Sequence, residues 1–133
     1  MPGGTSPTLT DLPVDALRIL QDARRAVLAT IAADGSPRIV PVGFALREGE
    51  VVTAIDRKPK SGRRLARLRN LERDARVSLL ADRWDEDWTG LGWVRVEGTA
   101  RIEAPGSAAA ELRARYPQYR EEPPDGEVIV VTP

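Results

Sequence analysis

Between Trp93 and Glu103 the chain alternates regularly between two kinds of side chain. The even positions from Val94 to Ile102 are all small or apolar, whereas the odd positions are Trp, Arg, Glu, Thr, Arg and Glu. Alternation with a period of two is the pattern of a β-strand with one buried face and one open face. The segment therefore predicts a long strand, and a fold built around it must contain a substantial β-sheet.

Shorter strand and helix patterns fill most of the remaining chain. Five further strands are expected at 26–31, 37–46, 51–55, 76–82 and 128–131. Asp34-Gly35 is a hairpin signal between the first two of these strands. Helices are expected at 10–24, 61–71 and 108–115. Six strands that look antiparallel, with short helices between them, predict a small closed β-barrel.

The middle helix has two distinct faces in the sequence. Leu65, Leu68 and Leu71 form one apolar stripe, and Ser61 is placed to cap the helix N-terminus. Arg63, Arg67 and Asn70 fall on the opposite side of the helix.

Length and composition limit the organisation of the protein. A chain of 133 residues is enough for one domain with a real core but not for two. Residues 1–9, rich in Pro, Gly, Ser and Thr, are expected to form a disordered tail, and residues 10–133 a single domain. No apolar run approaches the roughly 20 residues that span a bilayer, and the N-terminus lacks a signal-peptide pattern. We therefore expect a cytoplasmic protein without a membrane partner.

The chain contains no histidine and no cysteine. This excludes Ser-His-Asp and Cys-His catalysis, disulfides, thiolate metal sites, and zinc or haem held by histidine. If the protein is an enzyme, its chemistry most simply belongs to a bound cofactor, so we assign no catalytic side chain.

Positive charge is concentrated in one stretch of a chain that is neutral overall. Nine basic residues lie between Arg57 and Arg76, and two acids oppose them. Basic side chains at a helix N-terminus are unfavourable with the helix dipole unless an anion neutralises them. The stretch predicts a bound phosphate or other polyanion, while a solvated basic helix face remains the alternative. Nucleic acid is not expected, because the net charge is zero and no aromatic residues are interleaved with the basic ones.

Two further segments are candidates for contacts with a ligand or partner. Pro41 lies in the middle of an expected strand, where it cannot donate a ladder hydrogen bond, so an edge, a bulge or a ligand is expected there. The loop 82–88 carries acids between Trp84 and Trp88, but its spacing does not match a calcium-binding loop. We expect a packed interface loop there rather than a metal site. Trp93 lies on the polar face of its strand, where it is placed to cover a ligand or a partner.

Taken in order, several segments resemble the pyridoxamine 5'-phosphate oxidase-like superfamily, and especially its branch of coenzyme F-420-dependent enzymes. The similar segments are 29–37, 40–42, 57–60, 67–78, 85–88 and 115–119. The resemblance covers about Leu17 to Val131 and implies a six-stranded antiparallel split β-barrel. It also implies a homodimer whose flavin or deazaflavin lies between the two subunits.

The resemblance also implies which residues bind the cofactor. The phosphate-binding arginine of the second strand maps to Arg38. A basic pair at a strand end maps to Arg57 and Lys58, with Lys60 and Arg64 as further candidates. Segments that contact the ring system map to Val40, Pro41, Val42, Thr53 and Ala54, and Ser78 is a weaker candidate for the polar edge of the ring.

The expected function is an F-420-dependent oxidoreductase, a reductase that transfers a hydride between the deazaflavin and an unidentified small organic molecule. F-420 carries a phosphodiester and a polyglutamate tail, which suits nine basic residues better than the single phosphate of FMN does. An FMN-binding oxidoreductase of the same fold and a non-enzymatic F-420-binding protein are the alternatives. Because the chain ends at Pro133, any C-terminal segment that closes the site in relatives is expected to be missing.

Overall fold

A single antiparallel sheet organises the computed structural model, which describes residues 3–55 and 65–133. Its strands within these residues are β1 (Ala26–Ile31), β2 (Pro37–Val42), β3 (Ala45–Arg47), β4 (Glu50–Ala54), β5 (Arg76–Arg83), β6 (Gly92–Glu103) and β7 (Val128–Thr132). Their order across the sheet is β2-β1-β5-β6-β7-β4-β3, and every pairing is antiparallel. The expectation of a mostly β, antiparallel fold is therefore confirmed.

The core lies on the inner face of the curved sheet, as the alternation in β6 requires. Val94 and Val96 are buried, whereas Arg95 and Glu97 between them are exposed. Leu28 of β1 and Leu79 of β5 are fully buried in the same cluster. Burial of one such aliphatic side chain contributes about 1.5–3 kcal/mol, so this face supplies most of the folding free energy.

A second, smaller core lies on the other side of β4 and β7. Val52, Val128 and Val130 pack there with Leu112 and Ala108. Both faces of these two strands are covered, which is why their sequences are almost continuously apolar rather than alternating.

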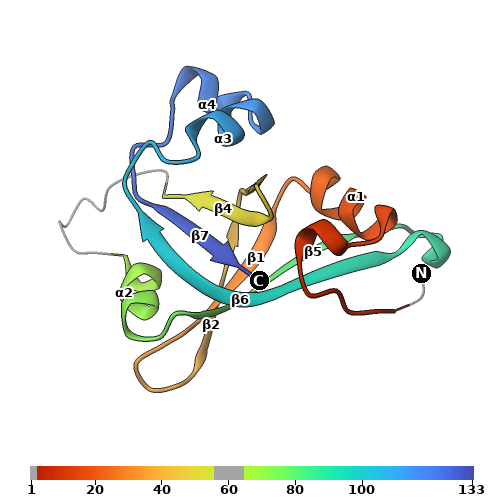
Figure 1. Ribbon diagram of the computed structural model, residues 1–133, viewed down its shortest axis with the longest axis horizontal. Coiled ribbons are helices and arrows are strands. Elements are labelled where there is room, and N and C mark those ends of the chain that lie inside the picture. The colour runs from red at the N-terminus through yellow and green to blue at the C-terminus, as the bar shows by residue number, and fades with distance from the viewer. Residues whose placement is uncertain (1–2, 56–64) are drawn as a thin grey trace.

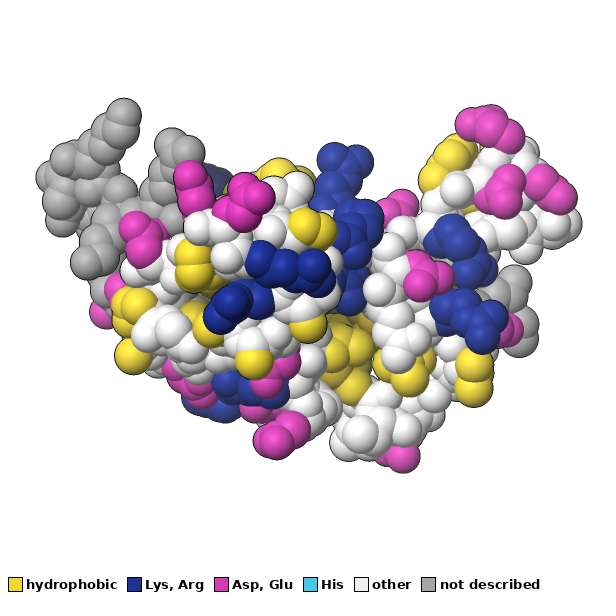
Figure 2. All heavy atoms as spheres, turned by 90° about the horizontal axis from the view of Figure 1, so that it is seen from above, with side chains coloured by type: hydrophobic (Ala, Val, Ile, Leu, Met, Phe, Trp, Pro, Cys, Tyr) yellow, Lys and Arg dark blue, Asp and Glu magenta, His cyan; other side chains and the backbone are white. Residues whose placement is uncertain are grey.

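Short helices cover the sheet at its ends (Figure 1). Those in the described residues are the 3-10 turns η1 (Leu9–Asp11) and η2 (Trp88–Gly90) and the α-helices α1 (Val14–Asp22), α2 (Ala66–Arg73), α3 (Ala109–Arg115) and α4 (Gln118–Glu121). The turn α4 was not expected from the sequence. Figure 2 looks down on the α1, α3 and α4 side, where basic side chains gather over the middle of the face.

The expected strand 37–46 is wrong in one respect, because it is two strands rather than one. β2 ends at Val42 and β3 begins at Ala45, so the sheet has seven strands in the described residues instead of six. The chain turns at Gly43 and Phe44, where Phe44 becomes fully buried and its N–H bonds to the Tyr116 hydroxyl at 2.9 Å. A contact with a residue far away in sequence therefore breaks the strand.

The middle helix also differs from its expected form. Its described part is α2, and the expected N-terminal portion with Ser61 lies outside the described residues. Leu68 and Leu71 are buried as expected, and Asn70, on the side opposite the leucine stripe, is also only 7% exposed. Its Nδ2 donates to Thr30 Oγ1 at 3.1 Å, so a polar pair replaces part of the apolar contact between α2 and β1.

The expected boundary at residue 9 falls within packed structure. Leu9 is 6% exposed and belongs to the main core cluster. Disorder of the residues before it stays a prediction. Among the described residues, no helix combines the length and the apolar character that a bilayer crossing needs.

Candidate functional site

A cavity of about 470 Å³ lies between α2 and the β1–β2 hairpin. Four arginines contribute to its wall, namely Arg38, Arg67, Arg69 and Arg73. Ile39 and Val40 of β2 and Ala66 of α2 supply apolar wall next to these charges. A cavity with several guanidinium groups and an apolar side is suited to a ligand that combines an anionic group with a planar or apolar part.

The position of α2 against this cavity is fixed by polar contacts near its C-terminus. Arg73 Nη2 donates to the Ile31 carbonyl oxygen at 3.1 Å and to Asn70 Oδ1 at 2.8 Å. Asn70 in turn donates to Thr30. A cation in the last turn of a helix is favourable with the helix dipole. This chain of contacts holds the arginine-bearing face of α2 at the end of β1.

The hairpin turn orders Arg38, the phosphate-binding candidate. Asp34 Oδ1 accepts hydrogen bonds from the Ser36 amide and hydroxyl, and these bonds lower the pKa of the Asp34 carboxyl. Arg38 Nη1 donates to Ser36 Oγ at 2.6 Å and to the Pro37 carbonyl at 3.2 Å. The exposed guanidinium is thus held at the rim of the cavity by hydrogen bonds to its sequence neighbours, an arrangement that a stronger anionic acceptor can replace.

A second cavity of about 450 Å³ lies on the outer face of the sheet. Ser78 lines it together with Arg76, Ala29, Pro37 and Glu97. Thr30 contributes to both cavities, so the two lie on either side of the same end of β1. Ser78 and Arg38 therefore line different cavities of one chain.

The ring-contact candidates are dispersed in this structure. Val40 lines the cavity at α2, whereas Pro41 is exposed on the outer face, where it pairs with Val27. Val42 and Thr53 are buried, Thr53 to 3% exposure, and Ala54 packs against the smaller core beside α3. Among the described candidates for cofactor binding, Arg38 and Val40 line the same cavity. The other described candidates do not line that cavity in one chain, and their roles in binding stay predictions.

Four candidates lie outside the described residues, namely Arg57, Lys58, Lys60 and Arg64. Their proposed contacts with an anion stay predictions. The structure instead adds residues that the sequence reasoning did not assign to the site, namely Thr30, Arg67, Arg69, Asn70 and Arg73. The density of arginine in 57–76 was the available signal, whereas periodicity alone did not show that Asn70 is buried.

A sequence profile of the pyridoxamine 5'-phosphate oxidase family matches residues 14–133. The chain belongs to the pyridoxamine 5'-phosphate oxidase family. The F-420H(2)-dependent biliverdin reductase of Mycobacterium tuberculosis (strain CDC 1551 / Oshkosh) is 30% identical to this chain over 125 residues, which cover 93% of this chain and 84% of that protein.

Solved structures agree with the family assignment at the level of the fold. A conserved hypothetical protein of Mycobacterium tuberculosis superposes with a TM-score of 0.73 at 22% identity, covering 98% of this chain and 85% of that one. A structure described as an F-420 reductase superposes with a TM-score of 0.65 at 20% identity, covering 92% of this chain and 95% of that one. The expected family and its split-barrel fold are therefore confirmed.

The acidic loop between β5 and β6 is held by its own hydrogen bonds. Asp85 Oδ1 accepts from the Asp87 amide, and Asp87 Oδ1 accepts from the amide and hydroxyl of Thr89. Trp84 and Trp88 of this loop are both exposed. Over residues 3–55 and 65–133, no group of three or more His, Cys, Asp and Glu side chains is arranged to hold a metal ion.

Proposed function

We propose that this protein is an F-420-dependent oxidoreductase that reduces a small organic molecule. The observation that carries the proposal is the arginine-lined cavity between α2 and the β1–β2 hairpin, in a chain of this family. Four guanidinium groups around one cavity favour a ligand with more than one negative charge. The relative that uses reduced F-420 supports this cofactor over FMN.

The described residues fit a role in binding and positioning. Arg38, Arg69 and Arg73 would hold the anionic part of the cofactor, and Val40 would lie against its apolar part. When bound, the deazaflavin supplies the hydride. The chain then has to orient two reactants and keep water away from them, which requires neither histidine nor cysteine.

Two alternatives keep the same fold. An FMN-dependent oxidoreductase would also use the arginine-lined cavity, because FMN is anionic. An F-420-binding protein without turnover would bind the cofactor but reduce nothing. Biliverdin is the first substrate to test, since the M. tuberculosis relative is named for its reduction. The substrate of this chain and its cytoplasmic location stay predictions.

We also propose that the protein acts as a homodimer with residues of both chains at each site. The outer face of β2, β1 and β5 presents apolar side chains to solvent, among them Ile39 at 73% and Leu80 at 42% exposure. An exposed apolar patch of this kind marks an interaction surface. A dimer would also bring together candidate residues that one chain leaves apart.

The deciding experiment is a titration of the purified protein with F-420 and with FMN. We expect F-420 to bind at least about tenfold more tightly, which corresponds to roughly 1.4 kcal/mol, and its affinity to fall with added salt. Arg38→Ala should weaken binding, while Arg113→Ala, an exposed arginine of α3, serves as the matched control. Equal or tighter binding of FMN at moderate salt would contradict the choice of cofactor.

The residues outside the described part need a separate variant. Arg57→Ala combined with Lys58→Ala should weaken F-420 binding while leaving the fold intact. Unchanged affinity of this double variant would place the anion elsewhere. Turnover of biliverdin with reduced F-420 then separates an enzyme from a protein that only binds the cofactor.

A further inference from the structure

The wall of the cavity at α2 contains two polar side chains that are almost completely buried. Thr30 of β1 is 3% exposed and Asn70 of α2 is 7% exposed, and both line the cavity together with the arginines. Thr30 lies on the same face of β1 as Leu28, which belongs to one core cluster with Leu68 of α2. Figure 1 shows α2 at the end of the sheet where the β1–β2 turn lies. Polar groups buried to this degree are normally hydrogen-bonded, so each of their protons calls for an acceptor.

The neighbours of Asn70 determine which way its amide group points. An arginine can only donate hydrogen bonds, and Arg73 Nη2 lies 2.8 Å from one terminal atom of Asn70, so that atom is the oxygen Oδ1. The amide nitrogen therefore faces Thr30 and donates to its Oγ1 at 3.1 Å. Because an amide nitrogen does not accept hydrogen bonds, the Thr30 hydroxyl is the acceptor in this contact.

The count of protons leaves two donors at this wall. Thr30 Oγ1 uses a lone pair for Asn70, so its own hydroxyl proton is still to be placed. Asn70 Nδ2 carries two protons and spends one of them on Thr30. Within residues 3–55 and 65–133, no oxygen accepts either of the two remaining protons. Since both side chains line the cavity, an oxygen atom of a bound ligand is in a position to accept them.

The surroundings of the two donors favour a negatively charged oxygen. Arg38, Arg69 and Arg73 line the same cavity, and no aspartate or glutamate is among the described residues of its wall. Hydrogen bonds to an ionised acceptor are roughly twice as strong as those between neutral groups. A phosphate group has several oxygen atoms, so it can accept from a guanidinium group and from neutral donors at the same time.

We propose that Thr30 and Asn70 bind the phosphate group of the cofactor directly, each through one neutral hydrogen bond. This inference rests on the proposed function, and it assigns the phosphate rather than the ring system to this wall of the cavity. The pair has a different role from the arginines. Guanidinium groups attract an anion through charge, which salt screens, whereas a hydroxyl and an amide select an acceptor at short range.

Removal of one hydroxyl group at two salt concentrations tests the direct contact. Thr30→Val replaces the hydroxyl by a methyl group and should weaken F-420 binding by about tenfold. The factor should be the same at low and at high salt, whereas the loss caused by Arg38→Ala should shrink as salt is added. Thr30→Ser keeps the hydroxyl and should stay within about threefold of the wild type. Thr99→Val, at an exposed threonine of β6, is the matched control.

A second variant removes the amide donor and keeps the packing. The carboxylate of Asn70→Asp can accept from Arg73 and from the Thr30 hydroxyl, so the contact between α2 and β1 is retained. The variant has no N–H at this wall and adds a negative charge. Its affinity for F-420 should therefore fall further than that of Thr30→Val, while its thermal unfolding midpoint stays near that of the wild type. Wild-type affinity in this variant would overturn the proposal.

The outcomes separate this inference from the proposed function. A loss in Thr30→Val that disappears at high salt would show that Thr30 only positions the arginines, and it would overturn direct binding. Unchanged affinity at both salt concentrations would do the same and leave the cofactor assignment intact. If the wild type binds FMN but not F-420, the choice of cofactor fails, and the phosphate of FMN tests the pair with the same variants. If it binds neither cofactor, titration with inorganic phosphate decides, and equal binding by wild type and Thr30→Val would overturn the inference. Asn70→Asp carries the test if Thr30→Val is poorly folded.

Discussion

Tyr116 joins three distant parts of the chain through one hydroxyl group. Its oxygen accepts a hydrogen bond from the Phe44 amide at 2.9 Å and donates one to the Arg24 carbonyl at 3.0 Å. Its ring lies so close to Gly43 that a Cβ at this glycine would be 3.3 Å from a ring carbon. Arg24 stacks over the same ring at 4.9 Å. The side chain thus fixes the bend that ends β2, directly after Val40 to Val42.

We predict that Tyr116→Phe destabilises the protein by about 1–3 kcal/mol, because the amide of the buried Phe44 loses its partner. Thermal unfolding should shift down by several degrees in consequence. Trp88→Phe, which changes an exposed aromatic residue in the acidic loop, provides the comparison. An unchanged midpoint for Tyr116→Phe would show that water replaces the lost hydrogen bond at no cost.

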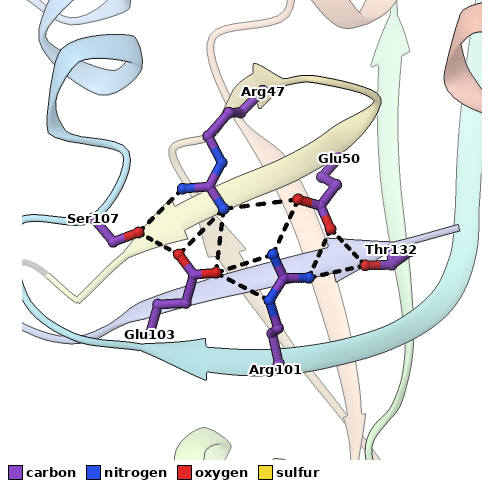
Figure 3. A network of polar contacts seen from close by, with 6 residues as sticks. All are labelled: Arg47, Glu50, Arg101, Glu103, Ser107 and Thr132. Atoms are coloured by element: carbon purple, nitrogen blue, oxygen red, sulfur yellow. Dashed lines mark hydrogen bonds and ion pairs between the residues drawn. The ribbon is translucent and has the colours of Figure 1, made fainter.

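At the scale of elements, a polar network joins the edge of the sheet to its long strand (Figure 3). Arg101 of β6 donates to Glu50 of β4 at 2.7 and 3.1 Å and to Glu103 at 3.0 Å. Arg47 of β3 pairs with Glu103 at 3.1 Å and with Glu50 at 3.7 Å. Thr132 of β7 donates to Glu50, and Ser107 donates to Glu103. Two cations and two anions on three strands, β3, β4 and β6, thus balance each other, and Thr132 extends the network to β7.

This network makes the fold sensitive to acid. Hydrogen bonds from Arg101 and then Thr132 lower the pKa of Glu50 from 4.5 to about 2. The bond from Ser107, followed by those from Arg47 and Arg101, lowers the pKa of Glu103 as well. A carboxyl with a lowered pKa in the folded state stabilises the fold above its unfolded pKa and loses that contribution as the pH falls. The loss should therefore occur between about pH 4.5 and pH 2.

We predict that Glu50→Gln lowers the free energy of unfolding at pH 7 by about 1 kcal/mol, since charged hydrogen bonds are lost at a partly exposed site. The variant should also lose less stability than the wild type between pH 4.5 and pH 2, the range that the pKa of Glu50 sets. Denaturant titrations at a series of pH values measure both effects. Glu122→Gln, on an exposed carboxyl outside the network, should follow the wild-type curve. Parallel curves for Glu50→Gln and wild type would refute the assignment.

At the scale of the whole molecule, binding and assembly should be coupled. The proposed site takes residues from two chains, so a ligand that binds the dimer better than the monomer also stabilises the dimer. We predict that the affinity for F-420 falls when the protein is diluted below its dimer dissociation constant. Affinity that does not depend on protein concentration would place the complete site within one chain.

Much of the fold was predictable from local patterns. The strands β1, β5, β6 and β7 and the hairpin at Asp34-Gly35 lie where alternation and turn residues place them, within a residue or two. Arg38 and Val40 were assigned to the site from the family resemblance, and both line the cavity at α2. The separation of Ser78 into another cavity was not predictable, because it depends on which face of a curved sheet each strand presents.

The sequence by itself determined most of the strands, the family and the concentration of arginine before β5, because propensity, periodicity and charge are local properties of the chain. The tertiary structure alone decided the break at Gly43 and the burial of Asn70, since each depends on a partner far away in sequence: Tyr116 in one case and Thr30 in the other.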